Sequence, residues 1–144
     1  MKVMIINGPN LNLLGIRETE KYGLTSYEQL CRDLVKYGEE KGIEVILRQS
    51  NHEGDLMDWM QEAYFQKMDG IILNAGGYSH TSIALHDAIL SLPIPVVEVH
   101  ITDILKREYF RQTSMLSSVA KHVIQGKGVQ GYFLALDWFL GGNV

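Results

Sequence analysis

The sequence predicts an α/β fold in which one parallel β-sheet is covered by helices on both faces. Short apolar runs alternate with amphipathic segments of helical period, the alternation occurs five times, and turn residues separate the segments. Strands and helices that alternate in this way form parallel sheets. At 144 residues, the chain is expected to be a single domain, 1–144, that buries one core without disulfides or metals.

The first strand and the first long helix have clear end signals. Val3–Ile6 is apolar and is predicted to be a buried strand that ends at Asn7-Gly8-Pro9. Thr25-Ser26-Tyr27-Glu28 fits the capping-box pattern and is predicted to begin a helix. This helix is expected to end near Gly42, because glycine readily takes the left-handed conformation of a helix C-cap.

The remaining elements continue the alternation. Further strands are predicted at Ile43–Leu47, Gly70–Leu73, Val96–His100 and Val123–Ile124, with helices around 56–64, at about 82–91 and at about 130–140. The Arg-rich segment after the fourth strand is also expected to be helical. Five strands in so short a chain favour the flavodoxin-like order 2-1-3-4-5, in which ligands bind beyond the carboxyl ends of the strands. A site is therefore expected at the loops after strands 1, 3 and 4.

Composition and charge narrow the class of protein. Hydrophobic residues make up 46% and charged residues 21% of the chain, and the net charge of -4 disfavours binding to nucleic acid or anionic membranes. The single cysteine, Cys31, fits a reducing compartment. The apolar start is too short for a signal peptide and no stretch approaches a membrane span, so a cytoplasmic protein is expected.

The loop after the first strand is rich in polar side chains. Roughly 18 residues without clear periodicity is long for a connection in a compact domain, and such loops are usually lids or binding loops. It carries Asn7, Asn10, Asn12, Arg17 and Tyr22, more polar groups than a solvated surface loop requires.

Polar residues also mark the third and fourth strand ends. Asn74 and His80 flank two adjacent glycines before a helix, a pattern that lets a ligand approach the backbone and the helix N-terminus. An ordinary capped turn would explain neither residue. In the fourth strand, alternation puts Glu98 and His100 on one face, where a carboxylate can orient a histidine for acid–base chemistry. A purely structural histidine is the alternative.

Two arginines complete the pattern, and no cofactor motif accompanies it. Arg107 and Arg111, spaced i and i+4, are expected on one helical face at the same rim, although a solvated helix face explains them equally well. Gly126–Gly131 matches G-x-G-x-x-G, but only 13 residues follow it, so it is predicted to be a tight turn. The five histidines lack metal-ligand spacing, and no cofactor is expected.

The converging Asn, Arg, Tyr and His suit proton abstraction next to a carbonyl, which predicts a lyase or isomerase acting on a small oxygenated acid.

These loops closely resemble those of the type II 3-dehydroquinate dehydratases, and order, spacing and chain length agree over essentially the whole chain. The resemblance is carried by Asn7–Gly15, Arg17-Glu18, Tyr22-Gly23, Arg48–Gly54, Ile72–Ser82, Glu98–Ile101 and Arg107–Arg111. It implies dehydration of 3-dehydroquinate to 3-dehydroshikimate by anti elimination through an enolate, without a cofactor. It also implies a homo-dodecamer, a tetramer of trimers.

The resemblance assigns catalytic roles to five residues. Tyr22 would remove the C2 proton as a tyrosinate stabilised by Arg17, because a nearby cation favours the charged phenol. Asn10 would hold a water against the enolate oxygen. His100, oriented by Glu98, would protonate the departing hydroxyl. The substrate would be bound by Asn74, His80, Asp87, Arg111 and the backbone of Ile101 and Thr102.

The sequence departs from the family's pattern at a few positions. Thr19 stands in place of a common Pro, His86 in place of a common Arg, and Gln112-Thr113 in place of a His pair. Thr102-Asp103 replaces Ser-Asn, and Asp103 is expected to weaken substrate binding by adding negative charge near the carboxylate site.

Two rival functions fit the same fold. A flavodoxin-like signalling or binding module would need an acidic cluster where Asn7 and Asn74 stand. Another small lyase, acting on a keto acid or keto phosphate, would want more cations in the pocket.

Overall fold

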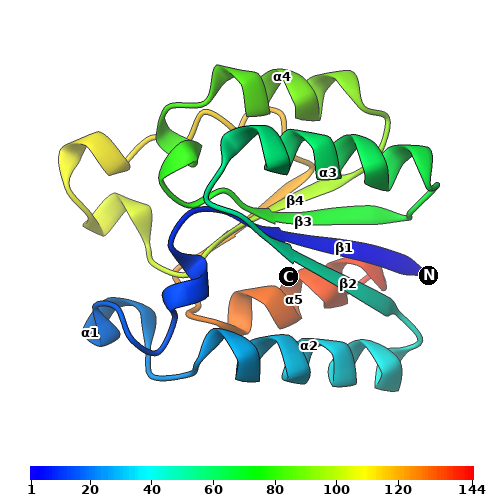
Figure 1. The fold of residues 1–144 in the computed structure, drawn as a ribbon, viewed down its shortest axis with the longest axis horizontal. Coiled ribbons are helices and arrows are strands. Elements are labelled where there is room, and N and C mark those ends of the chain that lie inside the picture. Colours follow the sequence, from blue (N-terminus) through cyan, green and yellow to red (C-terminus); the bar gives the residue numbers. More distant parts are fainter.

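The computed structural model describes residues 1–144 and contains one five-stranded parallel sheet in the predicted order β2-β1-β3-β4-β5 (Figure 1). The strands are β1 (Lys2–Asn7), β2 (Glu44–Gln49), β3 (Gly70–Asn74), β4 (Val96–His100) and β5 (His122–Gln125). The helices are α1 (Thr19–Tyr22), α2 (Tyr27–Lys41), α3 (Glu53–Phe65), α4 (Ile83–Ser91) and α5 (Gln130–Phe139). Four 3-10 turns join them: η1 (Leu11–Leu13), η2 (Gly76–His80), η3 (Ile104–Lys106) and η4 (Tyr109–Arg111).

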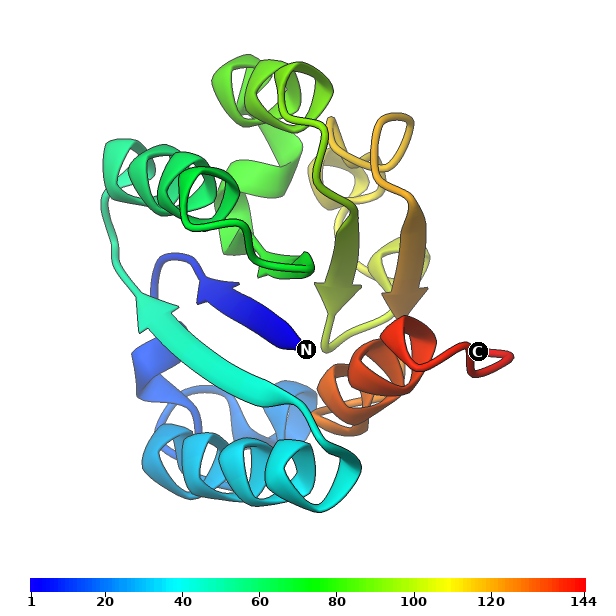
Figure 2. The ribbon, with the colours of Figure 1, turned by 90° about the vertical axis from the view of Figure 1, so that its right-hand side faces the viewer.

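Helices cover the sheet on both faces. Figures 1 and 2 show α3 and α4 over one face, and α2 and α5 over the other. Along β1, Val3 and Ile5 belong to the core cluster on the α2/α5 side, whereas Met4 and Ile6 belong to the cluster on the α3/α4 side. Burial on both faces explains why the central strands β1 and β3 are nearly continuous apolar runs. No helix is long and apolar enough to cross a membrane.

The two ends of α2 follow local sequence signals. The Ser26 hydroxyl accepts a hydrogen bond from the Gln29 N–H at 3.1 Å, so the cap lies one residue later than in the box predicted to start at Thr25. Gly42 ends the helix with φ of 79°, the expected left-handed C-cap.

The segment after β4 differs from the predicted helix. It forms two separate 3-10 turns, and Arg107 between them has an extended backbone with φ of -97°. Arg107 and Arg111 therefore do not share a helical face, and that prediction was wrong. The reason is tertiary: the Arg107 guanidinium donates to Thr102 Oγ1 at 3.2 Å and to the Tyr22 hydroxyl at 3.0 Å, and these contacts override local helix propensity.

The segment Gly126–Gly131 is a strand-to-helix turn, as predicted. Gly126 and Gly128 have φ of 76° and 60°, a region of backbone space that favours glycine. Their N–H groups donate to the carbonyls of Thr102 at 3.1 Å and Ile101 at 3.0 Å. The turn thereby fixes the backbone of the loop that follows β4.

Candidate active site

A cavity of about 190 Å³ lies at the carboxyl edge of the sheet, where the loops after β1, β3 and β4 meet. This is the switch point at which the sequence predicts a site. Nine of the eleven predicted site residues line it: Asn10, Arg17, Tyr22, Asn74, His80, His100, Ile101, Thr102 and Arg111. A tenth, Glu98, lies directly behind His100, with which it shares a hydrogen bond.

Tyr22 is held between two guanidinium groups. Arg107 donates a hydrogen bond from Nη1 to the Tyr22 hydroxyl at 3.0 Å, and the Arg17 guanidinium lies over the phenol ring, 4.1 Å from its centroid. Both arginines place positive charge beside the phenol, and the Arg17 contact is a cation–π interaction. Sequence reasoning assigned Arg17 to this task but gave Arg107 no catalytic role.

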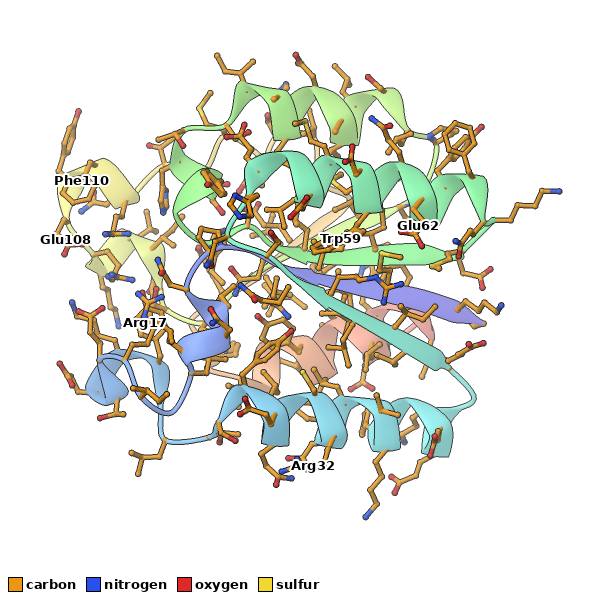
Figure 3. All side chains as sticks on the ribbon, in the orientation of Figure 1. Arg17, Arg32, Trp59, Glu62, Glu108 and Phe110 are labelled. Carbon is orange, nitrogen blue, oxygen red and sulfur yellow. The ribbon has the colours of Figure 1, made fainter.

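Arg111 adds a third guanidinium group to the cavity lining, beside those of Arg17 and Arg107. Glu108 Oε2 lies 3.0 Å from Arg111 Nε and 3.7 Å from Arg107 Nε. A backbone hydrogen bond and these two cations lower the pKa of Glu108. In Figure 3, Arg17 and Glu108 lie at the same end of the molecule, while Phe110 points outward. No carboxylate lines the cavity itself, so its charge favours an anionic ligand although the chain is negative overall.

His100 is oriented from behind by a buried carboxylate. Glu98 Oε2 accepts a hydrogen bond from His100 Nε2 at 2.5 Å, and the Glu98 side chain is fully buried. Burial raises the pKa of Glu98, but hydrogen bonds from His100, Ser114 and Ser117 and the charge of His100 outweigh it and hold that pKa below its usual value. An acceptor at Nε2 fixes the ring orientation and leaves Nδ1 as the nitrogen available to the cavity.

His80 is held in a similar way from η2. Its Nδ1 lies 2.8 Å from the carbonyl oxygen of Thr113. A carbonyl can only accept, so Nδ1 carries the proton and Nε2 is left for a ligand. The rings of His80 and His100 are stacked with centroids 6.4 Å apart, which places two imidazoles side by side at the cavity.

Asn74 is fixed by a buried polar network. Its Nδ2 donates to the Tyr132 hydroxyl at 2.9 Å, and its Oδ1 accepts from the Gly76 N–H at 3.1 Å. The Tyr132 hydroxyl in turn donates to Asn7 Oδ1 at 2.5 Å. Burial raises the pKa of Tyr132, so it stays a neutral donor. The amide of Asn74 is therefore held in one orientation at the cavity wall.

Asn10 occupies a left-handed backbone conformation, with φ of 69°. Its N–H donates to Asn51 Oδ1 at 3.0 Å, and Gln49 Nε2 donates to the neighbouring Gly8 carbonyl at 3.1 Å. Two side chains from the end of β2 and the loop after it thus anchor the start of the long loop after β1. Conformations of this kind persist where surrounding contacts enforce them, often at functional sites.

Two acidic residues lie outside the cavity. Asp87 is exposed on α4 and does not line the cavity of its own chain. Asp103 accepts from the Leu105 N–H at 3.1 Å, which caps η3, and lines a separate hollow with Lys21 and Lys106. Asp103 therefore does not line the cavity, although it directly follows Thr102, which does. The weaker substrate binding expected from its charge stays a prediction.

The cavity suits proton transfer between a phenol on one side and an imidazole on the other. No three His, Cys, Asp or Glu side chains are grouped so that they could hold a metal ion. The fold and the site together define an α/β protein whose cavity holds the groups that general acid–base chemistry on a small anion requires.

Comparisons with known proteins identify the family. The family described as Dehydroquinase class II matches residues 1–140. The 3-dehydroquinate dehydratase of Fusobacterium nucleatum is 52% identical over 142 residues, which cover 97% of each chain. That of Caldicellulosiruptor bescii is 49% identical over 135 residues, 94% of this chain and 93% of the relative.

Solved structures agree with the sequence comparisons. The type II dehydroquinase from Butyrivibrio crossotus matches with a TM-score of 0.96 and 47% identity over 97% of each chain. That from Propionibacterium acnes matches with a TM-score of 0.94 and 38% identity, covering 98% of this chain and 97% of the other. The chain belongs to the class II dehydroquinase family.

Proposed function

We propose that the protein dehydrates 3-dehydroquinate to 3-dehydroshikimate, and that Tyr22 and His100 are its base and acid. The observation that carries this proposal is that both side chains line the same cavity. The Tyr22 phenol contacts two guanidinium groups, and the His100 imidazole contacts the Glu98 carboxylate. The family relationship supplies the substrate.

The base is Tyr22 in its tyrosinate form. It removes the C2 proton next to the carbonyl, and the electron pair moves to the carbonyl oxygen as an enolate. The hydrogen bond from Arg107 and the Arg17 charge over the ring favour the phenolate. Asn10, which lines the cavity, holds a water against the enolate oxygen.

The acid is His100 as an imidazolium. When the enolate collapses, the carbon–oxygen bond to the neighbouring hydroxyl breaks, a carbon–carbon double bond forms, and His100 gives its proton to the departing hydroxide to make water. Glu98 stabilises the imidazolium before this step. The proton on Tyr22 then returns to His100, so that no net proton is gained or lost by the enzyme.

The other lining groups bind the substrate. Asn74 and the backbone of Ile101 and Thr102 hold the carboxylate, and His80 and Arg111 bind ring hydroxyls. The fixed amide of Asn74 and the braced Ile101–Thr102 loop support these roles, because groups already held in place lose little entropy on binding.

The direct test is to add 3-dehydroquinate and follow the ultraviolet absorbance of the conjugated enone product. We expect turnover by the parent chain and its loss in Tyr22→Phe and His100→Ala. Tyr64→Phe, on α3 away from the cavity, is the matched control and should retain turnover. Binding of 3-dehydroquinate without turnover by the parent would favour a binding module instead.

The chain also assembles, and the assembly completes the site. Asp87 can reach a substrate only in the cavity of a neighbouring copy, because it is exposed outside its own. Ile83 and Leu90 lie on the same side of α4 as Asp87, four before it and three after it, and are 62% and 69% exposed. We expect the homo-dodecamer implied by the family. In light scattering, Ile83→Lys with Leu90→Lys should give smaller species, whereas Phe65→Lys, equally exposed on α3, should not.

The remaining parts of the proposal concern location and pathway. The one free cysteine, Cys31, suits the reducing cytoplasm. Residues 1–144 act as one catalytic domain, since a single sheet carries both core clusters and the cavity. The reaction places the enzyme in the shikimate pathway or in quinate catabolism.

A further inference from the structure

Glu98 is a carboxylate in the middle of the sheet with no access to solvent. Its strand neighbours in β3 and β5 are Leu73 and Val123, which offer no side-chain donor. A buried charge is costly unless it is paired and hydrogen-bonded. One histidine cannot satisfy two carboxylate oxygens, so Glu98 needs further donors.

Those donors come from the segment Thr113–Ser117, which lies between η4 and β5 in the chain. Ser114 Oγ donates to Glu98 Oε2 at 2.5 Å, and Ser117 Oγ donates to Glu98 Oε1 at 2.6 Å. With His100 at Oε2, both oxygens are occupied. Ser114 Oγ also accepts from the Leu116 N–H at 3.1 Å, which turns its single proton toward Glu98.

We propose that Ser114 and Ser117 are positioning residues for the dehydration, holding Glu98 as a fixed carboxylate so that it keeps His100 charged and aimed at the cavity. This rests on the proposed role of His100 as the acid. Neither serine lines the cavity, so each acts only through Glu98.

The same segment is anchored at several points. The Met115 N–H donates to the Ser79 carbonyl at 2.7 Å, and the Thr113 and Met115 carbonyls meet Nδ1 of His80 and of His86 at 2.8 and 2.7 Å. A segment held at so many points can keep two hydroxyls in register with Glu98.

Few ionisable groups face Glu98. His100 is the direct partner on its own strand. From η2, His80 stacks on His100, and from α4, His86 turns toward the Met115 carbonyl instead of Glu98. The charge state of Glu98 therefore depends mainly on His100 and on the two serine hydroxyls.

The test compares Ser114→Ala, Ser117→Ala and the double variant with the parent. We expect kcat of the double variant to fall roughly 10-fold or more, the loss expected for hydrogen bonds to a charged group, while KM changes less than about 2-fold. The basic limb of the kcat–pH profile, which reports the acid, should move to lower pH, because Glu98 then supports the His100 imidazolium less well. Ser117→Thr keeps the hydroxyl and should restore the parent profile. Ser118→Ala, exposed and beside Ser117, is the matched control.

Two further measurements decide the outcome. In a Glu98→Gln background, replacing the two serines with alanine should lower kcat little further, because the carboxylate that they hold is already absent. NMR titration of the His100 ring should move to lower pH in the double variant. A folded double variant with an unchanged kcat–pH profile and an unchanged His100 titration overturns the proposal, as does full additivity with Glu98→Gln. If His100→Ala keeps turnover, the role of His100 as the acid is refuted. The NMR titration of His100 in the serine variants would still show whether the serines act on His100 through Glu98.

Discussion

Arg107 donates a hydrogen bond to the hydroxyl of Tyr22 at 3.0 Å, although 85 residues separate the two in sequence. Arg17, only five residues before Tyr22, lies over the face of the phenol ring, 4.1 Å from its centroid, and makes no hydrogen bond to its oxygen. Arg107 therefore donates to the oxygen that would carry the negative charge, whereas Arg17 contacts the face of the ring.

This arrangement predicts an order of effects on turnover. Tyr22→Phe should lower kcat by about 10²- to 10⁴-fold, the usual contribution of a general base, with substrate binding retained. Arg107→Ala should cost more than Arg17→Ala, because it removes the direct hydrogen bond. Since all three serve one step, adding either arginine change to Tyr22→Phe should slow the enzyme little further. Independent, additive losses in steady-state kinetics would mean that the arginines act elsewhere.

The buried carboxylate predicts a pH dependence of stability. Because the folded-state pKa of Glu98 is depressed, its stabilisation is complete above the ordinary carboxyl value of 4.5 and is lost as pH falls through the folded pKa. Urea unfolding should show a constant stability advantage of the parent over Glu98→Gln near neutral pH, and a narrowing advantage below pH 4.5. An advantage that does not change down to the pH of acid unfolding would contradict the ionised state of Glu98.

The network beneath Asn74 predicts a combined effect on stability and binding. Tyr132→Phe leaves Asn7 Oδ1 and one Asn74 amide hydrogen without a partner, which should lower the free energy of unfolding by about 1–3 kcal/mol. KM should rise more than kcat falls, since Asn74 is proposed to hold the substrate carboxylate. Thermal denaturation and steady-state kinetics measure the two parts. Tyr64→Phe, at the surface, is the control.

The chemistry of the cavity wall predicts the response to chemical probes. No lysine lines the cavity, and the nearest, Lys21 and Lys106, line the separate outer hollow. Borohydride added with substrate should therefore leave activity intact, because no amine is placed to form a Schiff base. Exhaustive EDTA treatment and dialysis should also leave turnover unchanged. Loss of activity with borohydride would require a different mechanism.

The position of the site could be predicted from the sequence, because it depends on strand order. Apolar runs identify strands, five short strands favour one topology, and that topology fixes which loops meet. The partnership of Glu98 and His100 could be predicted for a similar reason, since side chains two residues apart in a strand share a face.

The long-range partners could not be predicted. The i, i+4 spacing of Arg107 and Arg111 suggested a helix, but contacts of Arg107 with Thr102 and Tyr22 break it into two turns. Similarly, burial of Glu98 demands donors, yet nothing in the sequence says that they come from Ser114 and Ser117. Such contacts arise only when the whole chain is folded.

The two faces of the sheet have a stereochemical consequence. Tyr22 packs against the core cluster on the α2/α5 side. Glu98 and His100 alternate with Val97 and Val99 of that cluster, which puts them on the α3/α4 side. The proposed base and acid would thus approach the substrate from opposite sides, and the enzyme would distinguish the two hydrogens of the substrate methylene. Deuterium at the position facing Tyr22 should be washed out into water, whereas deuterium at the other prochiral position should be retained in the product.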